Sequence, residues 1–257
     1  MFHEQTATMN RIRFLLLSVV TLFFTLLAFL FFWTRYTFLR SLNIDYYLMR
    51  AWGNTLTFIY GIRREIFISE NADANSVGIY VAPHSSFWDI IILGSELKGF
   101  FVSKREVVKW PVIGLGAKFV RTVFIDREKG VSALKTLERA GTKTFNSGNS
   151  LIMFPEGTRS YDHMQNMKPG PFHVAITTGK PIKPVIIKYT PKENIVPKRK
   201  GNFVKELFNQ SVTAPGTIAT IEMLEDVYPM GYNSVDELKA HVHKVMDECY
   251  NSNNSCQ

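Results

Sequence analysis

Cysteine is scarce in this sequence: its two cysteines, Cys249 and Cys256, both lie near the carboxyl terminus. Such a chain excludes a disulfide scaffold and a cysteine-rich zinc site, and it suits a reducing compartment. No cluster of side chains has the spacing of metal ligands, so we expect no metal, and nothing indicates a bound cofactor. The G-x-S-x-G turn that presents a serine nucleophile in α/β-hydrolases is also missing.

Acidic residues are in the minority. Among 257 residues, 30 are Lys or Arg and 22 are Asp or Glu, so the formal net charge is +8. This excess predicts an anionic partner, which is a lipid surface, a phosphorylated substrate or nucleic acid. No recognition-helix, RNP-like or zinc-finger signature is present, so we expect no nucleic acid. The chain is 46% hydrophobic and 20% charged, which excludes a disordered or collagen-like polymer.

One long hydrophobic run, Phe14–Trp33, contains no charge, proline or glycine. As a helix it is about 30 Å long, which matches the hydrocarbon core of a bilayer. We expect the hydroxyls of Ser18, Thr21 and Thr25 to bond to the helix's own carbonyls. A signal peptide and a buried soluble helix are the alternatives, but the run is too long and too rich in Phe and Leu for either.

Basic residues are more frequent after this run than before it. The positive-inside rule therefore predicts an inner (cytoplasmic) membrane location with the main domain facing the cytoplasm. Two topologies stay open, because the helix either spans the bilayer or enters one leaflet as half of a hairpin.

Residues 42–61 have the pattern of an amphipathic helix, with apolar side chains at three- and four-residue steps. Either this helix packs on its own domain or it lies on the membrane surface. We expect three parts in the chain: a membrane anchor and linker helix at 1–61, an α/β domain at 62–250 and a frayed polar tail at 251–257.

From Ile62 onward, short β-branched runs alternate with helical stretches, which indicates an α/β fold with a mostly parallel sheet flanked by helices. The expected strands are Arg64–Ile68, Val77–Ala82, Phe100–Ser103, Thr122–Ile125, Ser150–Phe154, Lys183–Lys188 and Ile218–Met223. The expected helices are Ser86–Ser95, Trp110–Phe119, Gly130–Asn146, Pro171–Thr178 and Val235–Tyr250, the last with a capping box at Ser234 and Glu237. The basic stretch Lys192–Lys205 is either a solvated loop or a contact with an anionic surface.

His84 and Asp89 follow the expected strand that ends at Ala82. A carboxylate at this offset can orient the imidazole and leave its other nitrogen free to accept a proton. The spacing alone is a weak signal, because a surface histidine beside a helix start has the same pattern. The segments after other expected strands strengthen the interpretation of His84 and Asp89 as site residues. Charged residues that suit a phosphate ester recur in these segments, at Lys104-Arg105-Glu106, Asp126-Arg127 and Pro155–Ser160.

Four motifs occur in order between residues 76 and 190. They are H-x-S-x-x-D at His84–Asp89, K-x-E-V…P-x-x-G at Lys104–Gly114, F-I-D-R at Phe124–Arg127 and F-P-E-G-T-R-S at Phe154–Ser160. In this combination the chain resembles the 1-acyl-sn-glycerol-3-phosphate (lysophosphatidate) acyltransferases, glycerolipid acyltransferases with an H-x4-D motif. Pro83, Val107 and Lys183 stand where that family usually has asparagine, leucine and an aliphatic residue, and none of them is a candidate catalytic group.

The resemblance implies transfer of a fatty acyl group from acyl-CoA or acyl carrier protein to the sn-2 hydroxyl of lysophosphatidate at a bilayer. His84 is then the general base and Asp89 orients it, without a covalent acyl-enzyme. The resemblance places the acceptor at Glu156, Gly157 and Arg159; Glu156 either contacts the acceptor or forms an ion pair with Arg159. Further phosphate candidates are Lys104 and Arg105, and the supporting candidates are Ser86, Asp126, Arg127 and Thr158.

Three alternatives stay open. Ser85 or Ser86 lies near enough to His84 to act as a nucleophile. A sister acyltransferase would use another lysophospholipid or glycerol-3-phosphate as its acceptor. A membrane-tethered protein that only binds anionic lipid would use the same cations without catalysis. Phe87, Trp88 and Phe119 either line an acyl channel or pack in the core.

Overall fold

The computed structural model describes residues 12, 15–27, 30, 33–34, 45–110, 113–161, 163–197 and 203–252. It divides into two compact units, each made of segments that are distant in sequence. The first unit comprises residues 1–65, 85–96 and 189–219, and the second comprises residues 66–84, 97–188 and 220–257. Outside the described ranges lie the basic residues nearest to the apolar run (Arg11, Arg13, Arg35 and Arg40), residues 198–202 of the basic stretch Lys192–Lys205, and residues 253–257 of the polar tail.

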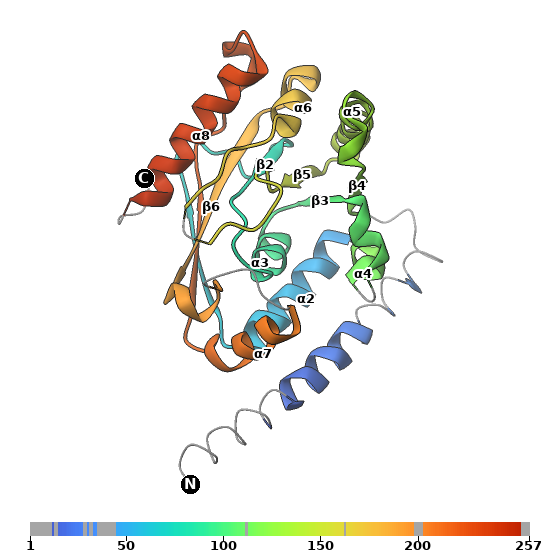
Figure 1. Cartoon of the computed structure of the whole chain (residues 1–257), viewed down its shortest axis with the longest axis vertical. Coiled ribbons are helices and arrows are strands. Elements are labelled where there is room, and N and C mark those ends of the chain that lie inside the picture. The colour runs from blue at the N-terminus through green and yellow to red at the C-terminus, as the bar shows by residue number, and fades with distance from the viewer. Residues whose placement is uncertain are drawn as a thin grey trace. The chain divides into compact units, whose positions relative to one another are not determined.

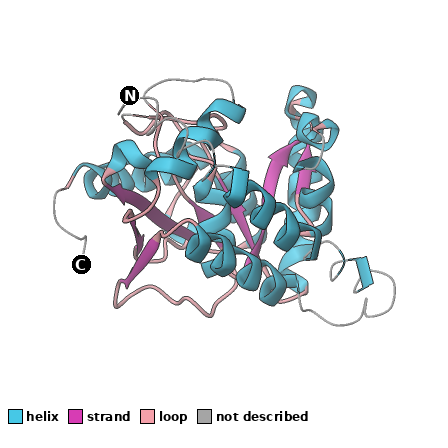
Figure 2. Ribbon diagram, turned by 90° about the horizontal axis from the view of Figure 1, so that it is seen from below, coloured by secondary structure: helices cyan, strands magenta, loops and turns pink. Residues whose placement is uncertain are grey.

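The seven expected strands are all present and form one sheet in the order β1-β7-β6-β2-β5-β3-β4 (Figure 1). Their bounds are β1 Arg63–Ile68, β2 Ile79–Val81, β3 Gly99–Lys104, β4 Val123–Ile125, β5 Ser150–Met153, β6 Ile182–Thr190 and β7 Ile218–Met223. β2 pairs in parallel with β5 and β6, and β3 pairs in parallel with β4 and β5. Figure 2 shows the strands with helices packed around them, so the α/β fold with a mostly parallel sheet is confirmed.

The register brings the carboxyl ends of four strands to one edge of the sheet. Val81 is level with Met153, and Lys104 is level with Ile125. Because parallel strands run in the same direction, the segments that follow β2, β3, β4 and β5 all leave from this edge. The charged residues that the sequence puts after these strands therefore start from the same side of the second unit.

The helices of the second unit are α4 Ile113–Phe119, α5 Val131–Asn146, α6 Gly170–Thr178 and α8 Val235–Asn251. α5 buries Ala133, Leu137 and Gly141, a stripe at four-residue steps that faces the sheet and α6. Gly141 has no side chain, and a Cβ there would meet a Val174 methyl at 3.0 Å, so the two helices approach closely. α4 begins three residues later than expected, because Arg105–Lys109 forms a 3₁₀ helix before it.

The capping box at the start of α8 is present. The Ser234 hydroxyl accepts a hydrogen bond from the Glu237 amide at 3.1 Å. The Glu237 carboxylate accepts one from the Asn233 amide at 2.9 Å, one residue earlier than the usual reciprocal bond. These bonds satisfy backbone donors that the first turn of the helix leaves unpaired.

The first unit contains α2 Asp45–Ile59, α3 Trp88–Glu96 and α7 Phe203–Thr213. α2 packs on α3: Met49 and Leu56 are buried, and a Cβ at Gly53 would meet the Ser95 Cβ at 2.7 Å. The helix expected at 42–61 therefore packs on its own unit. Trp88 is also buried, edge-on to the Tyr60 ring at 4.9 Å, which makes it a core residue.

The sequence pattern did not predict α7. Its buried face includes the polar residues Glu206 and Gln210, which interrupt the apolar stripe that normally reveals a helix. Burial of Gln210 is compensated in part, because its amide nitrogen donates to the Ile195 carbonyl at 2.7 Å.

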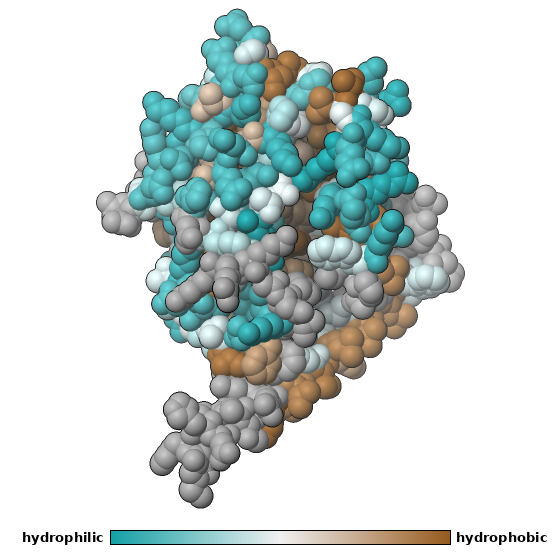
Figure 3. Space-filling model, in the orientation of Figure 1, coloured by the Kyte–Doolittle hydropathy of each residue, from teal (hydrophilic) through white to brown (hydrophobic). Residues whose placement is uncertain are grey.

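Residues 15–27 are helical, and large apolar side chains along them face outward (Figure 3). Those more than half exposed are Leu15, Leu16, Val19, Leu22, Phe23 and Leu26. The Thr21 hydroxyl lies 3.4 Å from the Tyr60 hydroxyl, within hydrogen-bond distance. Thr25 accepts a bond from the Trp52 indole at 3.3 Å, so one side of this helix meets α2. In the described part of the chain, no helix has the length and apolar character that crossing a membrane requires.

Candidate active site

His84 lies three residues beyond β2, at the carboxyl edge of the sheet, and is half-buried. Its ring stacks on Phe154 with 4.2 Å between centroids and 17° between planes. Phe154 in turn stacks on Phe101 at 5.9 Å. The His84 carbonyl accepts a hydrogen bond from the Ser160 amide at 2.7 Å. His84 therefore contacts both ends of the F-P-E-G-T-R-S segment. Its ring contacts Phe154 and its backbone carbonyl contacts Ser160.

Asp89 belongs to the first unit and lies in the first turn of α3, with no exposed surface. Its Oδ2 accepts hydrogen bonds from the amides of Ser85 and Ser86 at 2.7 and 2.8 Å. Its Oδ1 accepts one from the Tyr189 hydroxyl at 2.6 Å. A buried carboxylate must be compensated by donors, and these three supply that compensation.

Tyr189 is a site residue that the sequence analysis did not find. It is buried near the end of β6, and burial together with the Asp89 charge raises its pKa well above the usual range of a tyrosine. The hydroxyl therefore stays protonated and donates. No sequence signal could have singled it out, because a tyrosine in a buried strand has the same appearance as a core residue.

Ser85 and Ser86, the alternative nucleophiles, are both buried. The Ser86 hydroxyl donates to the Ile195 carbonyl at 3.2 Å and accepts from the Trp88 amide at 3.3 Å. A hydroxyl engaged in this way organises the start of α3, and its proton is directed away from any base. This geometry argues against Ser86 as a nucleophile.

The F-P-E-G-T-R-S segment makes a tight turn after β5. Gly157 has φ 76°, a backbone conformation that favours glycine, and a Cβ there would also displace the end of the Arg127 side chain, whose nitrogen would lie 2.6 Å from it. The Arg127 guanidinium donates to the Gly157 carbonyl at 3.2 Å, which joins the third motif to the fourth. The Glu156 carboxylate is buried and accepts from the Gln165 amide at 3.2 Å. Thr158 is exposed.

Arg159 is half-buried, with its guanidinium 5.8 Å from the Tyr161 ring centre. Burial lowers the pKa of Arg127, and the charge of Glu106 opposes this shift. Arg127 as a whole is exposed, so we regard the desolvation as local to the side that meets Gly157, and the guanidinium stays charged. Asp126 lies 3.7 Å from Lys129, within its own turn.

The second motif also lies at this edge. Lys104 and Arg105 are exposed, and the Lys104 ammonium lies 5.9 Å from the Trp110 ring centre. Gly114 has a packing role, because a Cβ there would lie 2.3 Å from the Val108 carbonyl oxygen. Pro111 lies outside the described residues.

Lys183 is buried in β6, where the resemblance predicts an aliphatic side chain. Its ammonium donates to the Asp226 carboxylate at 2.7 Å and to the Asp73 carbonyl at 2.6 Å. Because Asp226 supplies the opposite charge, the buried lysine is tolerated.

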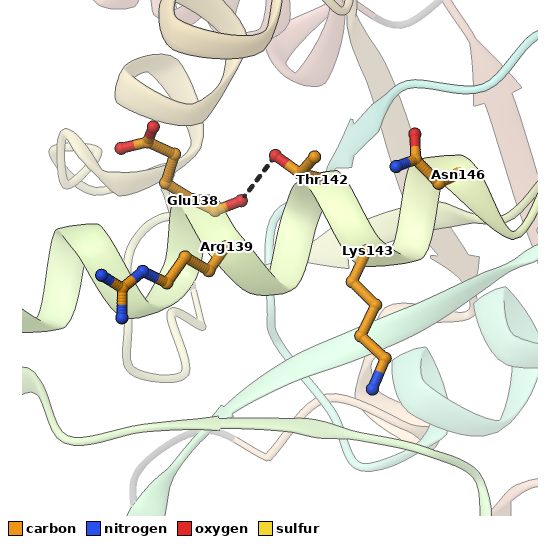
Figure 4. A pocket seen from close by; sticks show the side chains of 5 residues that line it. All are labelled: Glu138, Arg139, Thr142, Lys143 and Asn146. Carbon is orange, nitrogen blue, oxygen red and sulfur yellow. Dashed lines mark hydrogen bonds between the residues drawn. The ribbon is translucent and has the colours of Figure 1, made fainter.

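A hollow of about 420 Å³ lies elsewhere, over the exposed side of α5 (Figure 4). It is lined by Glu138, Arg139, Thr142, Lys143 and Asn146. All five come from one helix face, and none belongs to a motif, so we do not assign the active site to this hollow. Within the described ranges, no cluster of three or more His, Cys, Asp or Glu side chains could hold a metal ion.

The family model described as Acyltransferase matches residues 63–188, which contain all four motifs. Residues 63–188 therefore form an acyltransferase domain. This acyltransferase is 29% identical, over 161 residues, to the 1-acyl-sn-glycerol-3-phosphate acyltransferase of Haemophilus influenzae, a match that covers 61% of this chain and 67% of that protein. It is 32% identical, over 141 residues, to the enzyme of the same name from Limnanthes alba, covering 54% of this chain and 50% of that one.

The acyltransferase also resembles a solved structure over nearly its whole length. This is the crystal structure of the 1-acyl-sn-glycerophosphate acyltransferase PlsC from Thermotoga maritima, with a TM-score of 0.65 and 25% sequence identity. The match covers 93% of this chain and 95% of that one. By contrast, the sequence matches span about two thirds and one half of the two curated relatives.

Proposed function

We propose that this acyltransferase moves a fatty acyl group from a thioester to the free sn-2 hydroxyl of lysophosphatidate and so forms phosphatidate. The observation that carries the proposal is the attachment of His84 to the F-P-E-G-T-R-S turn, through Phe154 and Ser160, at a sheet edge rich in cations. The names of the similar enzymes support the same acceptor.

In the proposed reaction His84 accepts the hydroxyl proton while the hydroxyl oxygen attacks the thioester carbonyl. The new C–O bond forms, the C–S bond breaks, and the leaving sulfur takes the proton back from His84. Asp89 orients the imidazole and stabilises its charged form. No acyl-enzyme forms, which agrees with the engaged hydroxyl of Ser86.

Arg159 holds the acceptor phosphate in this proposal, because its planar guanidinium offers paired donors to phosphate oxygens. Glu156 and Gly157 shape the turn that presents it, and Arg127 braces that turn through the Gly157 carbonyl. Lys104 is a further, more exposed phosphate contact, together with the neighbouring Arg105.

Replacing Arg159 by alanine is expected to raise the KM for lysophosphatidate about 10- to 100-fold, since a hydrogen-bonded charged contact to phosphate is lost. The KM for the acyl donor should change less than twofold. Steady-state kinetics with each substrate varied in turn measure both values. Arg139→Ala is the matched control, because it removes the same charge from the exposed face of α5. An unchanged KM for lysophosphatidate in Arg159→Ala would move the phosphate site elsewhere.

One assay decides the acceptor and the donor. Membranes that contain the full chain are offered labelled acyl-CoA or acyl carrier protein with lysophosphatidate, lysophosphatidylglycerol or glycerol-3-phosphate. We expect labelled phosphatidate to form fastest. Faster acylation of another acceptor would favour the sister acyltransferase. Lysolipid binding without turnover, unaffected by loss of His84, would favour a binding protein.

The donor, acyl-CoA or acyl carrier protein, is anionic and cytoplasmic, which suits the net charge of +8. We place the acyltransferase at the cytoplasmic membrane, held there by its amino-terminal apolar helix and facing the cytoplasm. The outward apolar side chains of residues 15–27 support this placement. Contact with the bilayer spares the lysolipid extraction into water, which costs about 0.8 kcal/mol per methylene.

The membrane placement predicts that Phe23→Glu weakens association with liposomes. A charge on the lipid-facing side of the helix opposes insertion by about 2–3 kcal/mol, so bound protein should fall severalfold in a flotation assay. Val131→Glu is the control, because Val131 is an equally exposed apolar residue on α5 in the second unit. Equal flotation of Phe23→Glu and the unchanged chain would contradict the placement.

A further inference from the structure

The Asp89 carboxylate is held by two kinds of donor. The amides of Ser85 and Ser86 bind one oxygen, Oδ2, and both come from the turn that immediately precedes Asp89. The other oxygen, Oδ1, is bound by the Tyr189 hydroxyl, from a residue 100 positions later in the chain. The tertiary fold therefore decides what Oδ1 contacts, whereas the local turn decides what Oδ2 contacts.

In the bond between Tyr189 and Asp89, the tyrosine hydroxyl is the donor and the carboxylate is the acceptor. Asp89 has no exposed surface, Tyr189 is 6% exposed, and the two oxygens are 2.6 Å apart, a distance typical of a hydroxyl that donates to a carboxylate. Burial and the carboxylate charge raise the pKa of Tyr189, so its proton stays on the hydroxyl at neutral pH. The bond is therefore present throughout the pH range in which a histidine base works.

The strand that carries Tyr189 leaves little freedom to its side chain. Residues Ile182–Ile187 of β6 are all buried, and Lys188, just before Tyr189, donates to the carbonyls of Cys249 and Ser252. A rigid strand that aims one hydroxyl at one carboxylate oxygen is suited to fixing an orientation.

We propose that Tyr189 is a positioning residue for catalysis, which sets the plane of the Asp89 carboxylate. This inference rests on the proposed function of His84 and Asp89. A donor on Oδ1 from β6, added to the two backbone donors on Oδ2, holds the carboxylate at both oxygens. Because the carboxylate orients the base and does not bind substrate, loss of the Tyr189 hydroxyl should slow turnover and leave substrate binding intact.

Tyr189→Phe removes only the hydroxyl. We expect kcat to fall about tenfold, as loss of one hydrogen bond to a charged group commonly produces, while both KM values stay within twofold. The acid limb of the pH–rate profile should move to higher pH, because Asp89 keeps more negative charge to stabilise the protonated base. Tyr80→Phe is the matched control, since Tyr80 is equally buried and its hydroxyl donates to the Ala74 carbonyl at 3.4 Å. Wild-type kcat in Tyr189→Phe would overturn the proposal.

A double variant distinguishes failure of the proposed role of Tyr189 from failure of the proposed function. In an Asp89→Asn background, Tyr189→Phe should lower kcat less than twofold further, because the hydroxyl no longer has its carboxylate to orient. A further tenfold loss there would show that Tyr189 acts by another route and would overturn the inference. Failure of the proposed function has a different signature, which is an Asp89→Asn single variant with wild-type kcat.

A probe that keeps the hydroxyl covers the case in which Tyr189→Phe does not fold. Difluorotyrosine placed at position 189 retains the donor at neutral pH and ionises at lower pH than tyrosine. The kcat should then fall at alkaline pH values where the unmodified enzyme keeps its activity. An alkaline limb identical to that of the unmodified enzyme would overturn the proposal.

Discussion

Replacing His84 by alanine is expected to lower kcat by about 10²–10⁴-fold, the usual contribution of a positioned general base. The reason lies in where the side chain is held, since its ring stacks on Phe154 and its carbonyl receives the Ser160 amide. The measurement is acyl transfer from labelled acyl-CoA to lysophosphatidate by membranes with equal amounts of folded protein.

Two controls accompany the His84 variant. His84→Phe keeps a ring that can stack on Phe154 but accepts no proton, so it should lose as much activity as His84→Ala while retaining the fold. His173→Ala should leave kcat within twofold, because His173 lies on α6, 3.9 Å from Glu138 and outside the motifs. Turnover of His84→Ala within tenfold of the wild type would contradict the general-base role. Covalent labelling of Ser85 or Ser86 by an activated acyl ester would revive the nucleophilic mechanism.

Gly157→Ala is expected to lower kcat/KM for lysophosphatidate about 100-fold and to reduce the free energy of unfolding by about 1–3 kcal/mol. A Cβ at this position meets the Arg127 guanidinium at 2.6 Å and the Lys168 side chain at 3.0 Å, on a backbone with φ 76°. The Arg127 and Lys168 side chains must then move away from Gly157, and because Arg127 donates to the Gly157 carbonyl, the turn that presents Arg159 loses this support.

Gly148→Ala is the control that separates the effect of the positive φ from the effect of the contacts that the added Cβ makes. Gly148 has a similar φ of 71°, but a Cβ there meets nothing within 4 Å. The control should show the backbone strain alone, about 1 kcal/mol by chemical denaturation, with kcat/KM unchanged. Equal kinetic effects of the two substitutions would mean that the Gly157 turn does not shape the acceptor site.

Arg127 shows which part of the site the motifs predict and which part they do not. In the sequence, 26 residues separate Arg127, the end of F-I-D-R, from Phe154, the start of F-P-E-G-T-R-S. A parallel sheet nevertheless predicts that both motifs leave from the same edge. The contact between the Arg127 guanidinium and the Gly157 carbonyl is one that spacing cannot supply, because it depends on the path of each turn after its strand.

The sequence by itself determined the seven strands, the edge at which the charged residues gather, and the family. Hydrophobic runs and capping residues act over a few neighbours, so they can be read locally. Only the tertiary structure decided that Tyr189 holds Asp89, that α2 packs on α3, and that α7 exists around a buried Gln210. These features join residues distant in the chain, and they depend on which apolar faces and which polar groups are left to be buried or paired once the strands and helices have formed.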